Sequence, residues 1–236
     1  MNASARQTRI AAGAVGGNAI HPTHSKAAQR EFTGDLPTIC ARARDLCEKG
    51  RRRILGITGA PGCGKSTVAA ALIEALAPDA ALVPMDGFHL ANSELVRLGR
   101  RDRKGAVDTF DGAGYVALLR RLKNPDEDVV YAPQFRREIE EAIAGAIPVS
   151  REIPLVVTEG NYLLVESQPW SALRSLIDEV WFLESGEDIR IERLIARHIA
   201  YGKTPEFARA WSLGTDQRNA DLINSTRKNA DLVVRL

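Results

Sequence analysis

Eight residues in the first third of the chain have the types and spacing needed to hold phosphate. They read GAPGCGKS, from Gly59 to Ser66, and fit G-x-x-x-x-G-K-[ST], the Walker A pattern. An apolar run precedes them and a helical pattern follows, which is the context that this motif requires. The glycines let backbone N–H groups turn inward around phosphate oxygens, and the start of the next helix adds partial positive charge. We expect nucleotide phosphates to contact Gly59, Ala60, Pro61, Gly62, Cys63, Gly64, Lys65, Ser66 and Thr67.

The end of this stretch carries the side chains that phosphoryl chemistry uses. Lys65 is placed to reach the β- and γ-phosphates, and the hydroxyl of Ser66 is placed to bind Mg²⁺. The loop alone fits GTPases, motor ATPases and kinases equally well. Cys63 lies beside the positive start of a helix, which can make a thiol redox-sensitive. A small side chain is nevertheless all that the loop needs at that position.

Asp86 is the first residue that bears on what receives the phosphate. It ends a short apolar run that follows the first strand–loop–helix unit. Because ligands bind at the carboxyl ends of strands in open α/β sheets, Asp86 is expected to face the nucleotide loop. A carboxylate there can orient an acceptor hydroxyl and take its proton. The alternative is that Asp86 caps a short helix starting near His89.

Strands and helices that alternate along the chain must position these residues. Short apolar runs predict buried strands over 53–58, 80–86, 153–160, 178–184 and 230–236. Helical patterns cover 34–50, 65–77, 111–123, 168–177, 187–200 and 204–223. In the first of these helices Asp35 is the expected cap, and Cys40 and Cys47 are expected to share a face. This alternation predicts an α/β fold with a mostly parallel central sheet and helices on both faces.

The composition is that of an ordinary globular protein. The 236 residues are 44% hydrophobic and 26% charged, and 32 basic against 30 acidic residues leave a net charge of +2, which argues against a dedicated nucleic-acid binder. Three cysteines without metal-ligand spacing indicate reduced thiols in a cytoplasmic protein. The sequence contains no run of about 18 apolar residues, so no membrane span is predicted. Residues 1–32 are expected to be a mobile extension, and 33–236 a single domain.

One basic run, RLGRRDRKG at 97–105, invites a nucleic-acid interpretation. It places five positive charges around a single aspartate, Asp102. No aromatic residues are interleaved with them, as single-strand binding would require. A solvated loop that partly lines an anionic pocket is the alternative, and we expect no nucleic-acid partner.

Four stretches together resemble a known family. They are GITGAPGCGKST (56–67), MDGFH (85–89), RKGAVDTFDGAGYVALL (103–119) and VVTEGNYLL (156–164). In order and spacing they are similar to the phosphoribulokinase/uridine kinase family, and within it to pantothenate-kinase-like and sugar-kinase proteins. The resemblance covers about residues 36–236. It implies a P-loop NTPase-type three-layer sandwich with a helical lid around 190–210, and an ATP-dependent kinase that phosphorylates a hydroxyl of a small metabolite. Relatives are often dimers or larger, which makes a homodimer an open option.

The resemblance also implies roles for single residues. Asp86 matches the general base toward the acceptor hydroxyl, and Glu159 matches the acidic residue that closes the Walker-B-type strand and holds Mg²⁺. A helix cap or a loop carboxylate is the alternative for Glu159. Arg193 and Arg197, four apart on one helix face, match lid arginines that fold over the phosphates. Further lid candidates are His198 and Lys203. A solvated basic face, with Glu192 as an intrahelical partner, is the alternative for these arginines.

Acceptor and adenine contacts follow from the same resemblance. The expected acceptor contacts are Asp86, His89, Arg103, Lys104, Tyr131, Phe135 and Arg136, and Thr226 and Arg227 are expected beside the purine ring. Where uridine kinases resemble Tyr-Asp-Phe, this chain has Phe135-Arg136-Arg137, which disfavours uridine. Arg136 suits an anionic acceptor, or it pairs at the surface with Glu140. Pantothenate, a pentose or ketose, a nucleoside and a sugar phosphate all remain open as acceptors.

Two other classes of protein compete with a kinase. A regulatory switch that hydrolyses ATP or GTP slowly would share the phosphate loop. The sequence lacks the Asn-Lys-x-Asp guanine signature, which argues against a GTPase. A scaffold that has lost activity would not be expected to keep Lys65, Ser66, Asp86 and Glu159 together.

Overall fold

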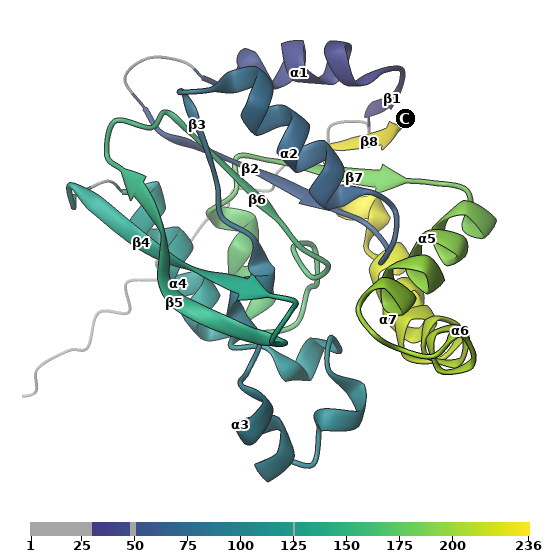
Figure 1. The fold of residues 1–236 in the computed structure, drawn as a ribbon. Coiled ribbons are helices and arrows are strands. Elements are labelled where there is room, and N and C mark those ends of the chain that lie inside the picture. Colours follow the sequence, from purple (N-terminus) through teal and green to yellow (C-terminus); the bar gives the residue numbers. More distant parts are fainter. Residues whose placement is uncertain (1–29, 48–50, 125) are drawn as a thin grey trace, which may run out of the picture.

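The computed structural model describes residues 30–47, 51–124 and 126–236, and its centre is a six-stranded sheet (Figure 1). The strand order is β1-β8-β7-β2-β6-β3, and every neighbouring pair is parallel. The strands are β1 (Arg30–Thr33), β2 (Arg53–Thr58), β3 (Ala80–Leu82), β6 (Leu155–Glu159), β7 (Glu179–Glu184) and β8 (Leu232–Arg235). The expected α/β class with a parallel sheet is confirmed.

Helices cover both faces of the sheet, as expected. Figure 1 shows α1 (Leu36–Arg44) and α2 (Lys65–Leu76) over one face and α4 (Gly112–Lys123) on the other. Each face has its own hydrophobic core: Ile54 of β2 packs in one, and Leu55 and Ile57 pack in the other. Strands buried on both faces are continuous apolar runs, which is why they were readable from sequence.

The parallel arrangement brings the carboxyl ends of the strands together along one edge of the sheet. β2 runs beside β6, with Ile57 paired to Glu159. The loop after β2 therefore starts next to the carboxylate that ends β6. The short 3₁₀ helix η1 (Met85–Phe88), which follows β3, reaches the same edge and carries Asp86.

Three helices lie at this edge: α5 (Glu187–Ala200), α6 (Pro205–Leu213) and α7 (Thr215–Ser225). The first two cover the region around 190–210 where a lid was expected, and α7 follows it. The single helix expected over 204–223 is wrong, because the chain breaks at Gly214, whose φ and ψ of −100° and −89° are not helical. Thr204 caps α6 by accepting a hydrogen bond from the N–H of Phe207 at 3.3 Å.

A two-stranded antiparallel sheet was not predicted. It consists of β4 (Val129–Arg136) and β5 (Glu141–Ser150), with a register shift between Ala132 and Gln134 around Pro133. Half of the β5 residues are exposed, and the turn before β5 is rich in charged residues, so the sequence lacks a clean alternation of polar and apolar positions. Below we refer to residues 129–150 as the hairpin.

The remaining elements are short. They are α3 (Asn92–Arg97) and the 3₁₀ helices η2 (Arg101–Arg103), η3 (Val107–Thr109), η4 (Trp170–Ser175) and η5 (Arg227–Asn229). The segment expected as a helix over 168–177 is thus a 3₁₀ helix. None of the described helices is both long and apolar enough to cross a membrane.

The start of the described chain differs from the expectation in two ways. β1 begins at Arg30, so the last residues of the expected extension pair with β8 instead; residues 1–29 lie outside the described part. Asp35 caps α1 as predicted, accepting from the N–H of Thr38 at 3.0 Å. The helix ends at Arg44, however, so Cys47 lies beyond it and shares no helix face with Cys40.

The hairpin packs directly against the loop that carries Asp86, and Gly87 permits this contact. A Cβ at Gly87 would lie 2.4 Å from the backbone oxygen of Pro133, which is a rigid neighbour. We therefore expect Gly87→Ala to displace the hairpin and to lower the free energy of unfolding by about 1–3 kcal/mol. Thermal unfolding measures this.

Gly186→Ala is the control, because a Cβ there meets only ordinary contacts, the nearest at 3.8 Å. Its expected cost is below about 1 kcal/mol, the difference between glycine and alanine as an N-cap. If the two variants are equally stable, the hairpin shifts to accommodate the Cβ at position 87 without strain.

Candidate active site

The phosphate loop connects β2 to α2 and depends on left-handed glycines. Gly62 has a φ of +87° and Gly64 a φ of +102°. A Cβ at Gly62 would lie 2.6 Å from the backbone oxygen of Arg190 on α5. The loop is thus pressed against the first turn of the lid region.

Lys65 is buried and folds back over its own loop. Its Nζ donates to the backbone oxygens of Gly59 at 2.8 Å and Ala60 at 3.2 Å. These carbonyls hold the ammonium at the mouth of the loop, where phosphate oxygens would replace or join them as acceptors.

Ser66 and Glu159 form an oxygen pair beside the loop. The Ser66 hydroxyl donates to Oε1 of the buried Glu159 at 3.1 Å. Within the described residues, no cluster of three or more His, Cys, Asp or Glu side chains could hold a metal. One hydroxyl and one carboxylate fit Mg²⁺, which usually takes few protein ligands and completes its shell with phosphate oxygens and water. The helix-cap alternative for Glu159 finds no support in its position at the end of a buried strand.

Burial and mutual repulsion give Glu159 and Asp86 different proton affinities. Burial raises the pKa of Glu159, and the nearby negative charge of Asp86 raises it further. Burial alone would also raise the pKa of Asp86, but His89, Arg137 and other cations outweigh it and lower that pKa below its usual value. Asp86 is therefore the carboxylate of the pair that stays ionised.

Asp86 lies in η1 and has a cationic partner from the hairpin. Oδ2 of Asp86 accepts a hydrogen bond from Nη2 of Arg137 at 3.1 Å. The next α-helix along the chain, α3, has Ala91 at its N-cap and no side-chain cap. The structure therefore gives no support to a capping role for Asp86.

An aromatic wall stands beside Asp86. The His89 ring packs against Phe110 and Phe135 at interplanar angles of 40° and 37°, with its centroid 4.0 and 4.6 Å from theirs. Nδ1–H of His89 donates to the backbone oxygen of Asp86 at 2.8 Å, and burial lowers the pKa of His89. Lys104 lies 5.2 Å above Phe135 and donates to Oδ1 of Asn92 at 2.8 Å. These side chains wall the half of the site that faces away from the phosphate loop.

The lid helix α5 turns three arginines toward the loop. Nη1 of Arg193 lies 3.7 Å from the position of a Cβ on Gly64, and Arg197 lines the same cleft. Burial and the neighbouring Arg137 lower the pKa of Arg197. Arg190 was missed by sequence reasoning: it is buried, and its Nη1 donates to the backbone oxygen of Pro61 at 3.1 Å. Its spacing from Arg193, three residues on the same helix face, was the signal that could have identified it.

A second polar group links α5 to α7. Nε2 of His198 lies 2.7 Å from Oδ2 of Asp216, and Lys203 lies 3.3 Å from the other ring nitrogen. Nζ of Lys203 also sits 5.5 Å from the ring centroid of Trp211. Sequence reasoning named His198 and Lys203 but not Asp216 or Trp211, whose proximity depends on the break at Gly214.

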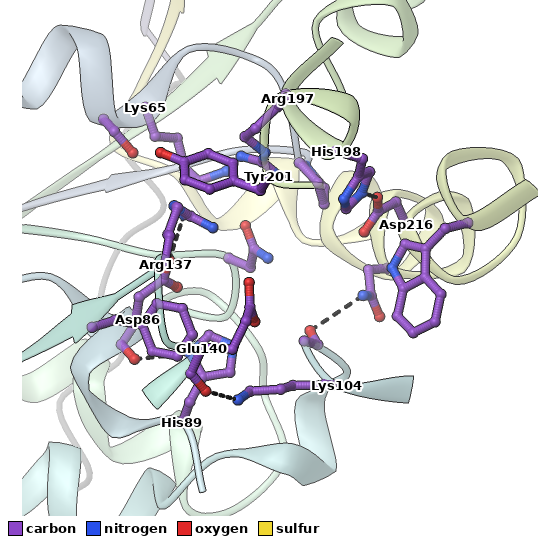
Figure 2. A pocket seen from close by; sticks show the side chains of 18 of the residues that line it. Lys65, Asp86, His89, Lys104, Arg137, Glu140, Arg197, His198, Tyr201 and Asp216 are labelled. Atoms are coloured by element: carbon purple, nitrogen blue, oxygen red, sulfur yellow. Dashed lines mark hydrogen bonds and ion pairs between the residues drawn. The ribbon is translucent and has the colours of Figure 1, made fainter. Parts of the chain in front are cut away.

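One cleft of about 1010 Å³ joins these groups (Figure 2). Its lining comes from the phosphate loop, η1, the hairpin, the end of β6 and the lid helices. The predicted residues that line it are Pro61, Gly62, Gly64, Lys65, Ser66, Thr67, Asp86, His89, Lys104, Phe135, Glu159, Arg193, Arg197, His198 and Lys203.

Three expected acceptor contacts do not line the cleft. Arg103 pairs with Asp108 at 2.8 Å, and Tyr131 is exposed on β4. Arg136 is also exposed, and Arg137 takes its place in the cleft. Successive residues of an extended segment point to opposite sides, so Phe135 and Arg137 face the cleft while Arg136 faces away from it.

The expected adenine contacts also lie outside this cleft. The Thr226 hydroxyl donates to the backbone oxygen of Ile223 at 2.7 Å. Arg227 bonds to Glu31 at 2.8 Å and to Glu184. The bond of Thr226 lies within the end of α7, and those of Arg227 join η5 to β1 and β7 of the sheet.

The basic run at 97–105 is partly neutralised by ion pairs. Arg97 pairs with Glu94 at 2.6 Å, and Arg100 lies 3.4 Å from Asp108. Arg101 and Lys104 line the cleft, so the charges of the run are divided between these ion pairs and the cleft.

These geometric features agree with the comparisons. The family model described as "Phosphoribulokinase / Uridine kinase family" matches residues 54–235, and the chain belongs to this family. It is 35% identical over 192 residues to "Uncharacterized protein YggC" of Escherichia coli (strain K12), covering 79% of this chain and 78% of that protein. It is 30% identical over 205 residues to "Putative uridine kinase C227.14" of Schizosaccharomyces pombe, covering 82% and 87%.

A solved structure shows the same architecture. The "putative fructose transport system kinase" of Silicibacter sp. TM1040 superposes with a TM-score of 0.77 at 36% identity, covering 85% of this chain and 98% of that one. Family and relatives together point to a P-loop kinase that phosphorylates a small metabolite.

Removal of the Glu159 charge should have opposite effects on stability and on metal binding. A raised pKa means that stability is lost as pH rises from about 4.3, the ordinary value, through the folded-state value. Glu159→Gln keeps an acceptor for Ser66 and removes this loss. We expect it to stabilise the metal-free protein by roughly 0.5–2 kcal/mol at pH 8 and to have little effect near pH 4.

Thermal unfolding in EDTA at both pH values measures the first effect. The same variant should weaken the Mg²⁺-dependent part of ATP binding by about 10–100-fold, measured by calorimetry with and without Mg²⁺. A destabilised variant at pH 8, or unchanged Mg²⁺ dependence, would contradict this description of Glu159.

Proposed function

We propose that this protein is an ATP-dependent kinase that transfers the γ-phosphate to a hydroxyl of a small metabolite: a sugar, a pantothenate-like or a nucleoside-like acceptor. One observation carries the proposal: the ionised Asp86 stands in the same cleft as the phosphate loop, beside a separate wall of aromatic side chains. Slow hydrolysis by a regulatory switch needs no such wall.

In the proposed reaction the loop amides and Lys65 hold the ATP phosphates. Mg²⁺, held by Ser66 and Glu159, would neutralise charge on the phosphate oxygens. The acceptor hydroxyl lies against Asp86, which takes its proton as the oxygen attacks the γ-phosphorus. The new O–P bond forms as the bond to the bridging β,γ-oxygen breaks, and ADP leaves with that oxygen.

The lid arginines complete the site. Arg193 and Arg197 would stabilise the charge on the transferring phosphoryl group and help to exclude water. Catalysis then comes mainly from positioning and electrostatics, because phosphoryl transfer requires little covalent help from the protein.

An acceptor screen tests the proposal. Mg-ATP is offered with D-fructose, D-ribose and uridine as neutral acceptors and with pantothenate and D-ribulose 5-phosphate as anionic ones. We expect ADP release to rise well above the acceptor-free rate with at least one class. ADP release that no acceptor changes would support the alternative, a nucleotide-dependent switch with slow ATP hydrolysis.

Asp86→Asn tests the base. We expect kcat with the best acceptor to fall by about 10²–10⁴-fold, because the amide cannot take the proton, while the Kd for ATP stays within about threefold. The control is Asp128→Asn, which makes the same change at an exposed residue directly before β4. Undiminished turnover by Asp86→Asn would exclude Asp86 as the base.

A further inference from the structure

Arg137 lines the cleft, and neither the sequence analysis nor the proposed mechanism gives it a role. It follows β4 directly, at the start of the hairpin turn, and its side chain is 34% exposed. Its guanidinium carbon lies 5.9 Å from the Phe135 ring centroid, and its Nη2 bonds Oδ2 of Asp86. Figure 2 shows it beside Asp86, on the side toward Lys65 and Arg197.

The turn that presents Arg137 is anchored independently of the lid. The backbone oxygen of Glu140 accepts from Nδ2 of Asn92 at 3.1 Å and from Lys104. The N–H of Asn92 donates to Oε1 of Glu141 at 3.0 Å. These bonds tie the turn to α3 and to the loop after η2. The turn, and with it the guanidinium of Arg137, is thus held beside Asp86 by bonds to α3 and to Lys104.

The contact with Arg137 uses only one of the two oxygens of Asp86. Within the described part of the chain, Oδ2 has Arg137 as its partner and Oδ1 has no hydrogen-bond donor. A carboxylate can accept at both oxygens simultaneously. Anchoring Oδ2 therefore fixes the direction in which Oδ1 points without blocking it.

We propose that Arg137 is the positioning residue of the base: it holds Asp86 through Oδ2 and leaves Oδ1 to take the proton of the acceptor hydroxyl. The inference rests on the proposed function, since it assigns Asp86 the proton. It differs from the role expected for Arg136, which was to contact an anionic group of the acceptor. A positioning arginine acts on every acceptor alike, whether neutral or anionic.

Kinetics of Arg137→Gln test this with the acceptors of the screen. We expect kcat to fall by about 10–100-fold with neutral and anionic acceptors alike, while KM for ATP stays within about threefold. Arg137→Lys should recover part of the loss, because it keeps the charge but not the planar fork. Guanidinium at low millimolar concentration should partly restore Arg137→Ala. Arg136→Gln, the adjacent exposed arginine, is the control and should behave as the unaltered protein.

Two kinetic results would overturn the inference. One is turnover by Arg137→Gln equal to that of the unaltered protein. The other is a loss confined to KM for anionic acceptors, which would make Arg137 an acceptor contact instead.

A structural comparison decides the matter without turnover. Crystal structures of the unaltered protein and of Arg137→Gln, grown under the same conditions with a non-hydrolysable ATP analogue, should show the Asp86 carboxylate rotated in the variant. An unmoved carboxylate would overturn the positioning role. If the unaltered protein phosphorylates no acceptor, the proposed function fails while this comparison still reports on Arg137.

Discussion

Two carboxylates in one cleft, Asp86 and Glu159, are the constraint on which the rest of the site depends. The parallel sheet places them together, because β3 and β6 are neighbours and end at the same edge. Two unpaired negative charges in such a place would be costly, and protonation of one would be the usual result. Cations around Asp86 keep it ionised, while burial and the charge of Asp86 raise the pKa of Glu159, which would hold the metal ion in the proposed mechanism. The asymmetry gives the two groups separate roles.

The elements around the sheet can be understood as suppliers of positive charge to this pair. α2 supplies Lys65 and the amides of its first turn, α5 supplies Arg193 and Arg197, and the hairpin supplies Arg137. Each source has its own support. Lys65 is held by loop carbonyls, and the start of α5 is fixed to the loop through Arg190 and Pro61. Burial and, after it, repulsion by Arg137 lower the pKa of Arg197, and a bound phosphate would relieve that repulsion.

The sequence predicted the part of this arrangement that local patterns encode. Buried strands are continuous apolar runs and the phosphate loop is a contiguous motif, so every strand of the sheet except β1 was accessible, as were Lys65, Ser66 and Asp86, and Glu159 followed from the family resemblance. The hairpin was not, because its exposed face lacks a clear period. Because the hairpin was not predicted, Arg136 instead of Arg137 was expected to contact the acceptor. Only the alternation of side chains along the extended segment tells which of the two adjacent arginines faces the cleft. Asp216 was missed for a similar reason, since its contact with His198 depends on how α7 folds back after Gly214.

The different anchors of the arginines also bear on how the site would work. Arg193 and Arg197 sit on the lid helix beyond its fixed first turn, so any opening of the lid would carry them away from the loop. The bonds named for the hairpin turn run to α3 and to the loop after η2, not to α5, so Arg137 would stay with Asp86 while the lid moves. Asp86 would then remain ionised and oriented when acceptor enters an open site. Closure would add the charges that the transferring phosphoryl group needs, and only at that stage. Arg137, the partner of Asp86, is thus anchored separately from Arg193 and Arg197, which would face the phosphates. This separation allows Asp86 to be oriented for the acceptor before the lid arginines complete the transfer site.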